Sequence, residues 1–225
     1  MAVRGPGRRD RRQELLAVAS QLFVTQGYHA TSMDDIATAM KLNKGTLYYY
    51  YESKANLLFD ILLGVNRRYL EAVRVREPGL SSSEAVRRYI ETTVTYILEN
   101  VNDTRLNQQE FPFIDRWLSR DQANMLLDLF REIEAYLKLL VVAAIEDKEF
   151  REVEPRIVTE MIVGMASWLP RWFKPGGKYS VLEVARHYSS VLVDGLLLQA
   201  GPLPGAPDAP AKPKARRRAK RDAAD

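Results

Sequence analysis

Apolar residues recur three and four positions apart along most of the chain, and this spacing predicts helices in almost every segment. Strand-like alternation is nearly absent. The chain is therefore expected to be all-α. The pattern predicts about nine helices, over residues 10–26, 33–40, 44–51, 54–76, 82–101, 104–117, 120–147, 155–172 and 180–199.

Helix caps near the N-terminus divide the first three helices. Gly27 supplies a left-handed stop for the first, and Ser32 with Asp35 forms a capping box for the second. Asn43 and Ser53 are suited to cap the third and fourth helices. The third helix is therefore only about seven residues long and follows a tight turn.

Further along the chain, proline and glycine mark the breaks. Pro112 is expected to kink or end the helix over 104–117, and "KPGGKYS" separates the last two helices. Residues 201–225 contain one apolar residue larger than alanine. Such a segment cannot bury enough surface to offset its ordering entropy, so we expect it to be disordered.

Four consecutive tyrosines occupy positions 48–51 of the short third helix. A helix over 44–51 places Leu47 and Tyr51 one turn apart on a face toward the core. The other three phenols, Tyr48, Tyr49 and Tyr50, are then exposed. A very short helix after a three- or four-residue turn is typical of the recognition helix that enters the major groove of DNA. A tyrosine-rich interface or core helix is the alternative.

Basic residues gather at the two ends of the 225-residue chain. Residues 1–12 hold five arginines against one aspartate, and residues 201–225 hold seven Lys or Arg against three Asp. Each end carries +4, as does the whole chain, so the body between them carries −4. Flexible cations favour a phosphate-bearing partner such as nucleic acid. Solubilising tails are the alternative.

Several function classes find no support in the sequence. Cysteine is absent, which excludes disulfides and thiolate sites, and the longest apolar run, "LLVVAAI" over 139–145, is far shorter than a membrane span. His29 and His187 have no carboxylate at ligand spacing, and no nucleotide or nucleophile fingerprint appears. We therefore expect a cytoplasmic protein that is not an enzyme and has no metal, cofactor or membrane partner.

The stretch "ATSMDDIATAMKLNKGTLYYYYESKANLL" resembles the DNA-binding signature of the tetracycline-repressor (TetR) family, and residues 10–60 match it almost end to end. The resemblance implies a homodimer with a helix-turn-helix domain and basic arm over 1–54. It also implies a helical effector-binding and dimerisation domain over 55–200, before the basic tail. The turn commonly has glycine where this chain has Lys41. Either Lys41 adopts a left-handed conformation, at a cost of about 1 kcal/mol, or the turn differs.

The predicted DNA contacts follow from this placement. We expect base-edge contacts in the groove, and phosphate contacts from residues beside it and from the arginines before residue 13. Gly45 permits close approach of the backbone. The residues predicted to bind DNA are Ser32, Lys44, Gly45, Thr46, Tyr48, Tyr49, Tyr50 and Lys54.

The segment "WLPRWFKPGG" over 168–177 is similar to members of the family that respond to acyl-coenzyme A thioesters. The resemblance implies an acyl-CoA effector, with cations meeting its phosphates at the opening of an apolar pocket. Core or dimer packing of the tryptophans is the alternative. The residues predicted to bind the effector are Tyr96, Phe111, Trp117, Met125, Trp168, Arg171, Trp172 and Lys174.

The last two predicted helices are the expected dimer interface. Each carries a stripe of apolar residues and glycine, which either faces a second copy or covers the core of its own chain. These stripes are Ile157, Met161, Gly164 and Trp168, and Val184, Tyr188, Val191 and Gly195.

The sequence favours a ligand-responsive repressor. A helical acyl-thioester-binding or carrier protein without specific DNA binding is the alternative, and a nucleoid protein that binds through its tails is a third.

Overall fold

The structure is all-α, as predicted. It is a computed structural model that describes residues 8–74 and 77–197. Residues 1–7 of the basic start and the predicted tail over 201–225 lie outside these ranges, whereas Arg11 and Arg12 lie in the first helix and pair with Glu14 and Asp60. Within them the elements are α1 (Arg8–Gln26), α2 (Met33–Ala39), α3 (Lys44–Tyr50), α4 (Lys54–Val73), α5 (Ser82–Glu99), α6 (Val101–Glu110), the 3-10 turn η1 (Phe111–Phe113), α7 (Ile114–Trp117), α8 (Arg120–Glu146), α9 (Pro155–Trp172) and α10 (Val181–Leu196).

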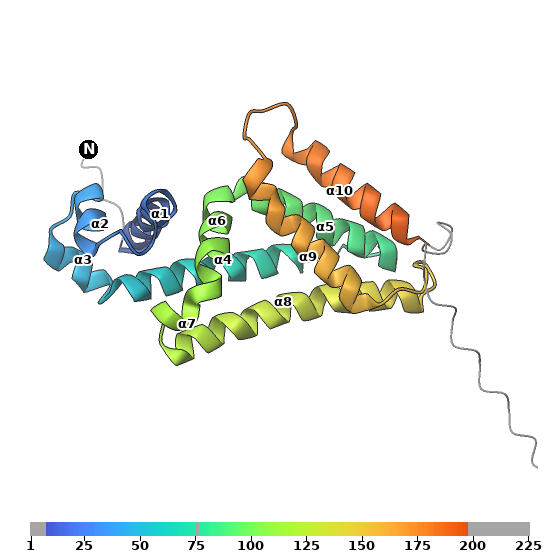
Figure 1. Ribbon diagram of the computed structural model, residues 1–225, viewed down its shortest axis with the longest axis horizontal. Helices are drawn as coiled ribbons and strands as arrows, with labels where there is room; N and C mark the ends of the chain where they lie inside the picture. Colours follow the sequence, from blue (N-terminus) through green and yellow to red (C-terminus); the bar gives the residue numbers. More distant parts are fainter. Residues whose placement is uncertain (1–7, 75–76, 198–225) are drawn as a thin grey trace, which may run out of the picture.

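Helices α1, α2 and α3 form a small bundle at one end of the molecule (Figure 1). Leu15, Phe23, Ile36 and Leu47 have no exposed surface and form its core. Burial of these side chains gives the three helices, two of them only seven residues long, a stable arrangement that their own hydrogen bonds would not supply.

The predicted caps are confirmed. The Ser32 side chain accepts from the backbone N–H of Asp35, whose carboxylate accepts from the backbone N–H of Ser32. Asn43 Oδ1 accepts from the backbone N–H of Thr46 at 2.7 Å, and Ser53 caps α4 in the same manner. These bonds satisfy amides that a helix leaves unpaired at its N-terminus, so the boundaries of α2, α3 and α4 are set locally.

The single helix predicted over 104–117 is divided into α6, η1 and α7. Pro112 lies within η1, where its missing N–H removes a helical hydrogen bond, so the predicted break is confirmed. The helical segment also begins three residues earlier than predicted, at Val101. The break turns the chain from α6 toward the start of α8 (Figure 1).

The long helices form the second part of the molecule. Helix α4 runs from the small bundle into this body, where it packs against α5, α6 and α8, while α10 lies along α5 (Figure 1). None of the helices in the described ranges is both long and apolar enough to cross a membrane.

The outer faces of α9 and α10 differ in how well they match the predicted stripes. On α9 the whole stripe is exposed, with Ile157 60% and Trp168 57% accessible. On α10 Val191 is 74% exposed, but Val184 is only 5% exposed, so its predicted place on the outer stripe is wrong. Helix α10 needs a buried face against α5, and that face includes Val184.

Candidate functional site

The turn between α2 and α3 is closed by a left-handed residue. Lys41 has φ 52°, its backbone N–H donates to the Thr38 carbonyl at 3.0 Å, and the Leu42 N–H donates to the Ala37 carbonyl at 2.9 Å. This pair of bonds is a Schellman motif, which ends α2 and usually requires glycine at the left-handed position. Of the two conformations predicted for the turn, the left-handed Lys41 is the one observed.

Helix α3 separates its aromatic residues between the core and the surface. Leu47 is fully buried and Tyr51 is 4% exposed, whereas Tyr48 is 41% and Tyr49 67% exposed, as predicted. Tyr50 is only partly exposed, with the Tyr49 ring edge-on to it at 5.6 Å between centroids, so it is less exposed than predicted. The surface of α3 therefore presents mainly Tyr48 and Tyr49.

Tyr51 holds α3 against α1 and α4. Its hydroxyl donates to Asp60 Oδ2 at 2.7 Å, and the Arg12 guanidinium lies 5.4 Å from its ring centroid. Arg12 also forms an ion pair with Asp60. Burial, followed by the hydrogen bond to Asp60, raises the pKa of Tyr51, so the phenol stays neutral. Three helices thus meet at one cluster, which fixes the orientation of the exposed tyrosines.

The polar residues predicted to contact DNA form local bonds in the free protein. Lys44 pairs with Asp34 at 2.9 Å, with both side chains 61% exposed, and the Thr46 hydroxyl donates to Asn43 Oδ1 at 2.8 Å. Such an exposed ion pair is worth little and exchanges readily for a phosphate. The Ser32 hydroxyl donates to the Asp35 carboxylate within the capping box.

Gly45 is exposed at the start of α3. A Cβ at this position would meet only Asn43 Oδ1, at an ordinary 3.6 Å, and the glycine has no positive φ. The fold itself therefore does not require glycine here.

Lys54 has a different position from the one predicted. Its ammonium donates to the backbone carbonyls of Tyr28 at 2.7 Å, His29 at 3.2 Å and Thr31 at 2.7 Å. An ammonium has three N–H donors, so all of them are used. This geometry contradicts the predicted phosphate contact and gives Lys54 a structural role. Burial lowers the pKa of Lys54.

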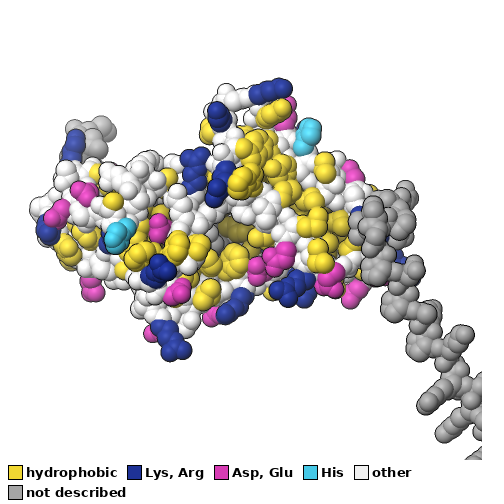
Figure 2. All heavy atoms as spheres, viewed as in Figure 1, with side chains coloured by type: hydrophobic (Ala, Val, Ile, Leu, Met, Phe, Trp, Pro, Cys, Tyr) yellow, Lys and Arg dark blue, Asp and Glu magenta, His cyan; other side chains and the backbone are white. Residues whose placement is uncertain are grey.

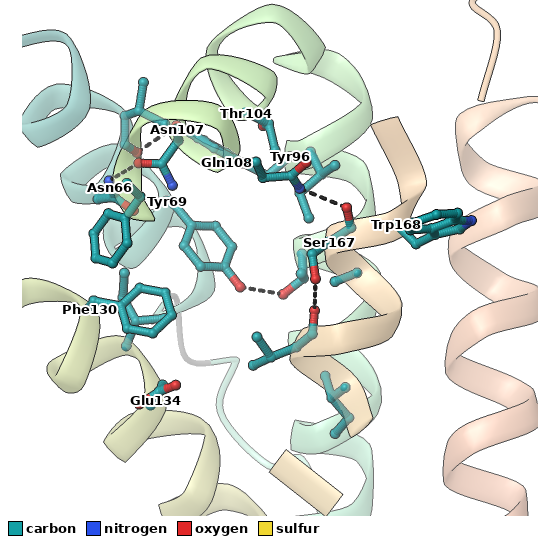
Figure 3. A pocket seen from close by; sticks show the side chains of 18 of the residues that line it. Asn66, Tyr69, Tyr96, Thr104, Asn107, Gln108, Phe130, Glu134, Ser167 and Trp168 are labelled. Atoms are coloured by element: carbon teal, nitrogen blue, oxygen red, sulfur yellow. Dashed lines mark hydrogen bonds between the residues drawn. The ribbon is translucent and has the colours of Figure 1, made fainter. Parts of the chain in front are cut away.

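A cavity of about 440 Å³ lies in the helical body (Figure 3). Its walls come from α4, α5, α6, η1, α8 and α9, and the space-filling view shows the apolar hollow between cationic and acidic side chains (Figure 2). Four residues predicted to bind the effector line this cavity, namely Tyr96, Phe111, Trp168 and Arg171.

The other four predicted effector residues lie elsewhere. The Trp117 ring packs near Tyr28, at 5.5 Å between centroids, where the body meets the small bundle. Met125 is 46% exposed, and Trp172 packs edge-on to Phe173 at the end of α9. The remaining one, Lys174, is exposed. None of the four lines the cavity, because each is on a helix face or loop that points away from it.

An aromatic and hydroxyl cluster in the cavity wall was not predicted from the sequence. The Tyr69 hydroxyl lies 3.1 Å from the Tyr89 hydroxyl and 2.9 Å from the Thr93 hydroxyl. Burial raises the pKa of both tyrosines, so they remain neutral hydrogen-bonding groups. The spacing of Tyr89, Thr93 and Tyr96 on one face of α5 is the signal that could have shown them.

A polar set on α6 was also missed. Thr104, Asn107 and Gln108 line the cavity beside Asn66 of α4 (Figure 3). Asn107 and Gln108 are three and four residues after Thr104, a spacing that places all three on one helix face. This spacing is the sequence pattern that could have predicted the set.

Two charged residues complete the lining. The Arg171 guanidinium lies 4.7 Å from the centroid of the Trp168 ring, on the exposed side of α9. Glu134 of α8 is partly buried, and burial, with the nearby Glu160 carboxylate, raises its pKa. A cation and a carboxyl group therefore border a space whose other lining residues are uncharged.

Family models match both parts of the chain. Residues 15–61 match the model of bacterial regulatory proteins of the tetR family, and residues 79–196 match a tetracyclin repressor-like C-terminal domain. The second match alone covers more than half of the chain. The chain belongs to the TetR family. TetR-family proteins are transcriptional regulators rather than enzymes, which agrees with the absence of catalytic motifs from the sequence.

The similarity to individual TetR-family relatives extends over most of the chain. The HTH-type transcriptional repressor KstR2 of Rhodococcus jostii is 28% identical over 195 residues, which cover 84% of this chain and 93% of the relative. The structure of PfmR from Thermus thermophilus has a TM-score of 0.71 at 30% identity and covers 85% of this chain and 98% of its own.

A more distant neighbour was solved with ligand and DNA. AibR in complex with isovaleryl coenzyme A and operator DNA has a TM-score of 0.70 at 21% identity, covering 81% of this chain and 98% of its own. At this identity the likeness establishes the shared fold alone.

Proposed function

We propose that this protein is a homodimeric repressor that binds a palindromic operator through α3 and is released by a small-molecule effector in the cavity. The observation that carries the proposal is the position of Tyr48 and Tyr49. Both are exposed on a short helix whose start, turn and inner face are fixed by caps, Lys41 and Tyr51. The name of the KstR2 relative supports a repressor rather than an activator.

In this proposal α3 enters the major groove of the operator. Tyr48, Tyr49, Thr46 and Lys44 face base edges, and Gly45 lets the helix backbone approach closely. Tyr50 and the Ser32 region face phosphates. A tyrosine ring packs on sugar and thymine methyl groups, and its hydroxyl donates to phosphate oxygen, so two adjacent phenols give both affinity and sequence preference.

A dimer is required because a single motif reads too few bases. In a two-fold dimer the two recognition helices lie about 34–36 Å apart, or a simple multiple of that distance, and read a palindrome. The exposed apolar stripe of α9 supports an interface there, since soluble monomers rarely expose such a surface. From α10 we retain Val191, Gly195 and the half-buried Tyr188 for the interface and leave out the buried Val184.

The effector that the site supports best is an acyl-coenzyme A thioester. The aromatic cavity suits an acyl body. Arg171 on its exposed side suits the phosphates of the coenzyme A head, because guanidinium groups bind phosphate in a bidentate manner. The isovaleryl coenzyme A bound by AibR adds support from a protein of the same fold.

Release requires that the effector prefer one conformation of the dimer. A ligand of equal affinity for both conformations would shift nothing. Helix α4 contributes Val65, Asn66 and Tyr69 to the cavity and begins at Lys54 against the small bundle. A shift of α4 on ligand binding would therefore change the spacing of the two recognition helices.

Selection of DNA fragments by the purified protein tests the first half of the proposal. A repressor should select a palindrome. A thioester carrier should select nothing, and a nucleoid protein should bind without sequence preference and with a steep salt dependence.

Titration of the protein–operator complex tests the second half. Release by a long-chain acyl-coenzyme A, but not by the free acid or coenzyme A alone, supports the thioester effector. Arg171→Ala should abolish release and leave operator affinity intact. Lys174→Ala is the matched control, because Lys174 is a nearby exposed cation that does not line the cavity. Equal release by the free acid would refute the role of the head group.

A further inference from the structure

One face of α6 presents polar groups to a cavity that is otherwise mainly aromatic and aliphatic. Thr104, Asn107 and Gln108 project from this face, and Asn66 meets them from α4 (Figure 3). Thr104 and Asn66 are 8% and 6% exposed. Buried polar groups are costly unless they are hydrogen-bonded, so the partner of each of these groups matters.

The orientation of the Asn107 amide follows from its neighbours. Asn66 Nδ2 donates to the Leu62 carbonyl at 2.8 Å, which fixes that atom as a nitrogen, and it also donates to Asn107 Oδ1 at 2.9 Å. The nitrogen of Asn107 is therefore on the other side of the amide, toward the cavity (Figure 3). Its N–H groups make no hydrogen bond with the rest of residues 8–74 and 77–197.

The same reasoning applies to Gln108 and Thr104. Gln108 Nε2 donates to the Ser167 carbonyl at 2.8 Å, which leaves its Oε1 as an acceptor. The Thr104 hydroxyl forms no hydrogen bond within the described ranges. The α6 face thus offers a donor from Asn107, an acceptor from Gln108, and a hydroxyl from Thr104 that can be either.

We infer that the effector is an apolar molecule whose buried body carries an oxygen function, keto or hydroxyl, that Asn107 and Thr104 bind. The inference rests on the proposed function, because it assigns chemistry to the same cavity. A plain hydrocarbon chain in this place would leave these groups without partners. A site built to hydrogen-bond an oxygen rejects an analogue that lacks it.

A coenzyme A arm also carries amides that polar side chains could bind. The burial of Thr104 favours contact with the body of the ligand instead. Trp168 and Arg171 lie on the exposed side of α9, where a head group would sit. Thr104 is nine-tenths buried. Thr104 and the adjacent Asn66 are buried in the cavity wall, so we assign the bound oxygen function to the part of the ligand that enters the cavity.

Calorimetric titration of the full-length protein tests the inference without DNA. The probes are dodecanoyl-coenzyme A and its 3-hydroxy, 3-oxo and 12-hydroxy counterparts, each also as the free acid. We expect at least one oxygenated thioester to bind roughly two- to tenfold more tightly than the plain chain, the range for one net hydrogen bond.

Thr104→Val and Asn107→Leu should reduce this preference to about one. Thr93→Val is the matched control: it removes a hydroxyl from the same cavity that is already bonded to Tyr69, and it should leave the preference intact. Thr104→Val removes no hydrogen bond of the free protein, so it should fold normally by circular dichroism.

The possible outcomes distinguish the proposed thioester effector from the inferred oxygen function on its body. Equal binding of plain and oxygenated thioesters by the wild type overturns the inference and leaves the thioester effector standing. Equal weakening of both probes by Asn107→Leu would assign Asn107 to the arm and also overturn it. If no thioester binds, the thioester effector fails, and this inference fails with it.

Discussion

The ammonium nitrogen of Lys54 lies 2.7 Å from the carbonyl oxygen of Tyr28 and 4.5 Å from the centroid of the same residue's ring. Lys54 is the first residue of α4, and Tyr28 follows α1, so one cation joins the long helix to the small bundle. The ammonium satisfies carbonyls of a turn that contains no regular secondary structure.

Removal of this ammonium should destabilise the protein. Lys54→Met keeps an apolar stem and leaves the three carbonyls without their donor, so the free energy of unfolding should fall by about 1–3 kcal/mol in urea denaturation. Lys44→Met is the control, because the exposed Lys44–Asp34 pair should contribute only about 0–1 kcal/mol. Equal effects of the two substitutions would contradict the structural role of Lys54.

Loss of the Tyr49 phenol should weaken operator binding. Tyr49→Ala should reduce specific binding by about 1–3 kcal/mol, measured as operator affinity against random duplex, because it removes the proposed contacts of the ring and hydroxyl with the groove. The thermal midpoint should change little, since the side chain is 67% exposed. Tyr179→Ala is the control on another exposed tyrosine. Unchanged operator affinity for Tyr49→Ala would mean that α3 is not the recognition helix.

A glycine in the turn should stabilise the protein. Lys41 holds φ 52°, and Lys41→Gly relieves about 1 kcal/mol of left-handed strain, which raises the thermal midpoint by roughly 2–4 °C. Lys41→Ala is the control, because alanine keeps the Cβ and the strain. A lower midpoint for the glycine variant would show that the Lys41 side chain itself contributes to stability.

Low pH should remove the contribution of the Glu149 carboxylate to the stability of the fold. Its carboxylate accepts from the Ser83 N–H at 2.9 Å and the Ser81 hydroxyl at 2.8 Å, and bonds to Ser83 and its neighbours lower the pKa of Glu149 from 4.5 to about 2. A lowered folded pKa stabilises the fold above the unfolded value and loses this effect as pH falls from about 4.5 to about 2. Glu149→Gln should therefore be less stable than wild type at pH 7.

The comparison of the two proteins should be repeated at lower pH. The stability difference between wild type and Glu149→Gln should shrink between pH 4.5 and pH 3 in urea denaturation. A stability difference that is constant with pH would mean that the charge of Glu149 does not stabilise the fold.

A charge on the outer stripe of α9 should disrupt the proposed dimer. Met161 is 56% exposed and does not line the cavity, so Met161→Glu should shift the protein toward monomer in sedimentation at micromolar concentration without unfolding it. Leu139→Glu is the control, at an equally exposed apolar residue on α8. A wild-type monomer under these conditions would refute the interface.

Local patterns in the sequence were sufficient for most of the helices and for the caps that begin α2, α3 and α4. These caps, and the division of α3 between Leu47 and the exposed Tyr49, depend on residues within a few positions of one another. Such interactions are repeated wherever the same spacing occurs, because the geometry of a helix turn is constant.

Contacts between distant segments were decided only by the tertiary structure. Lys54 carries a charge that suits phosphate, yet it bonds carbonyls of a turn more than 20 residues earlier. Trp117 and Met125 are as apolar as Phe111, but only Phe111 reaches the cavity. The axial rotation and crossing of α4, α6, α8 and α9 determine which side chains meet. This arrangement depends on several helix faces that pack together, so the sequence of one helix does not determine it.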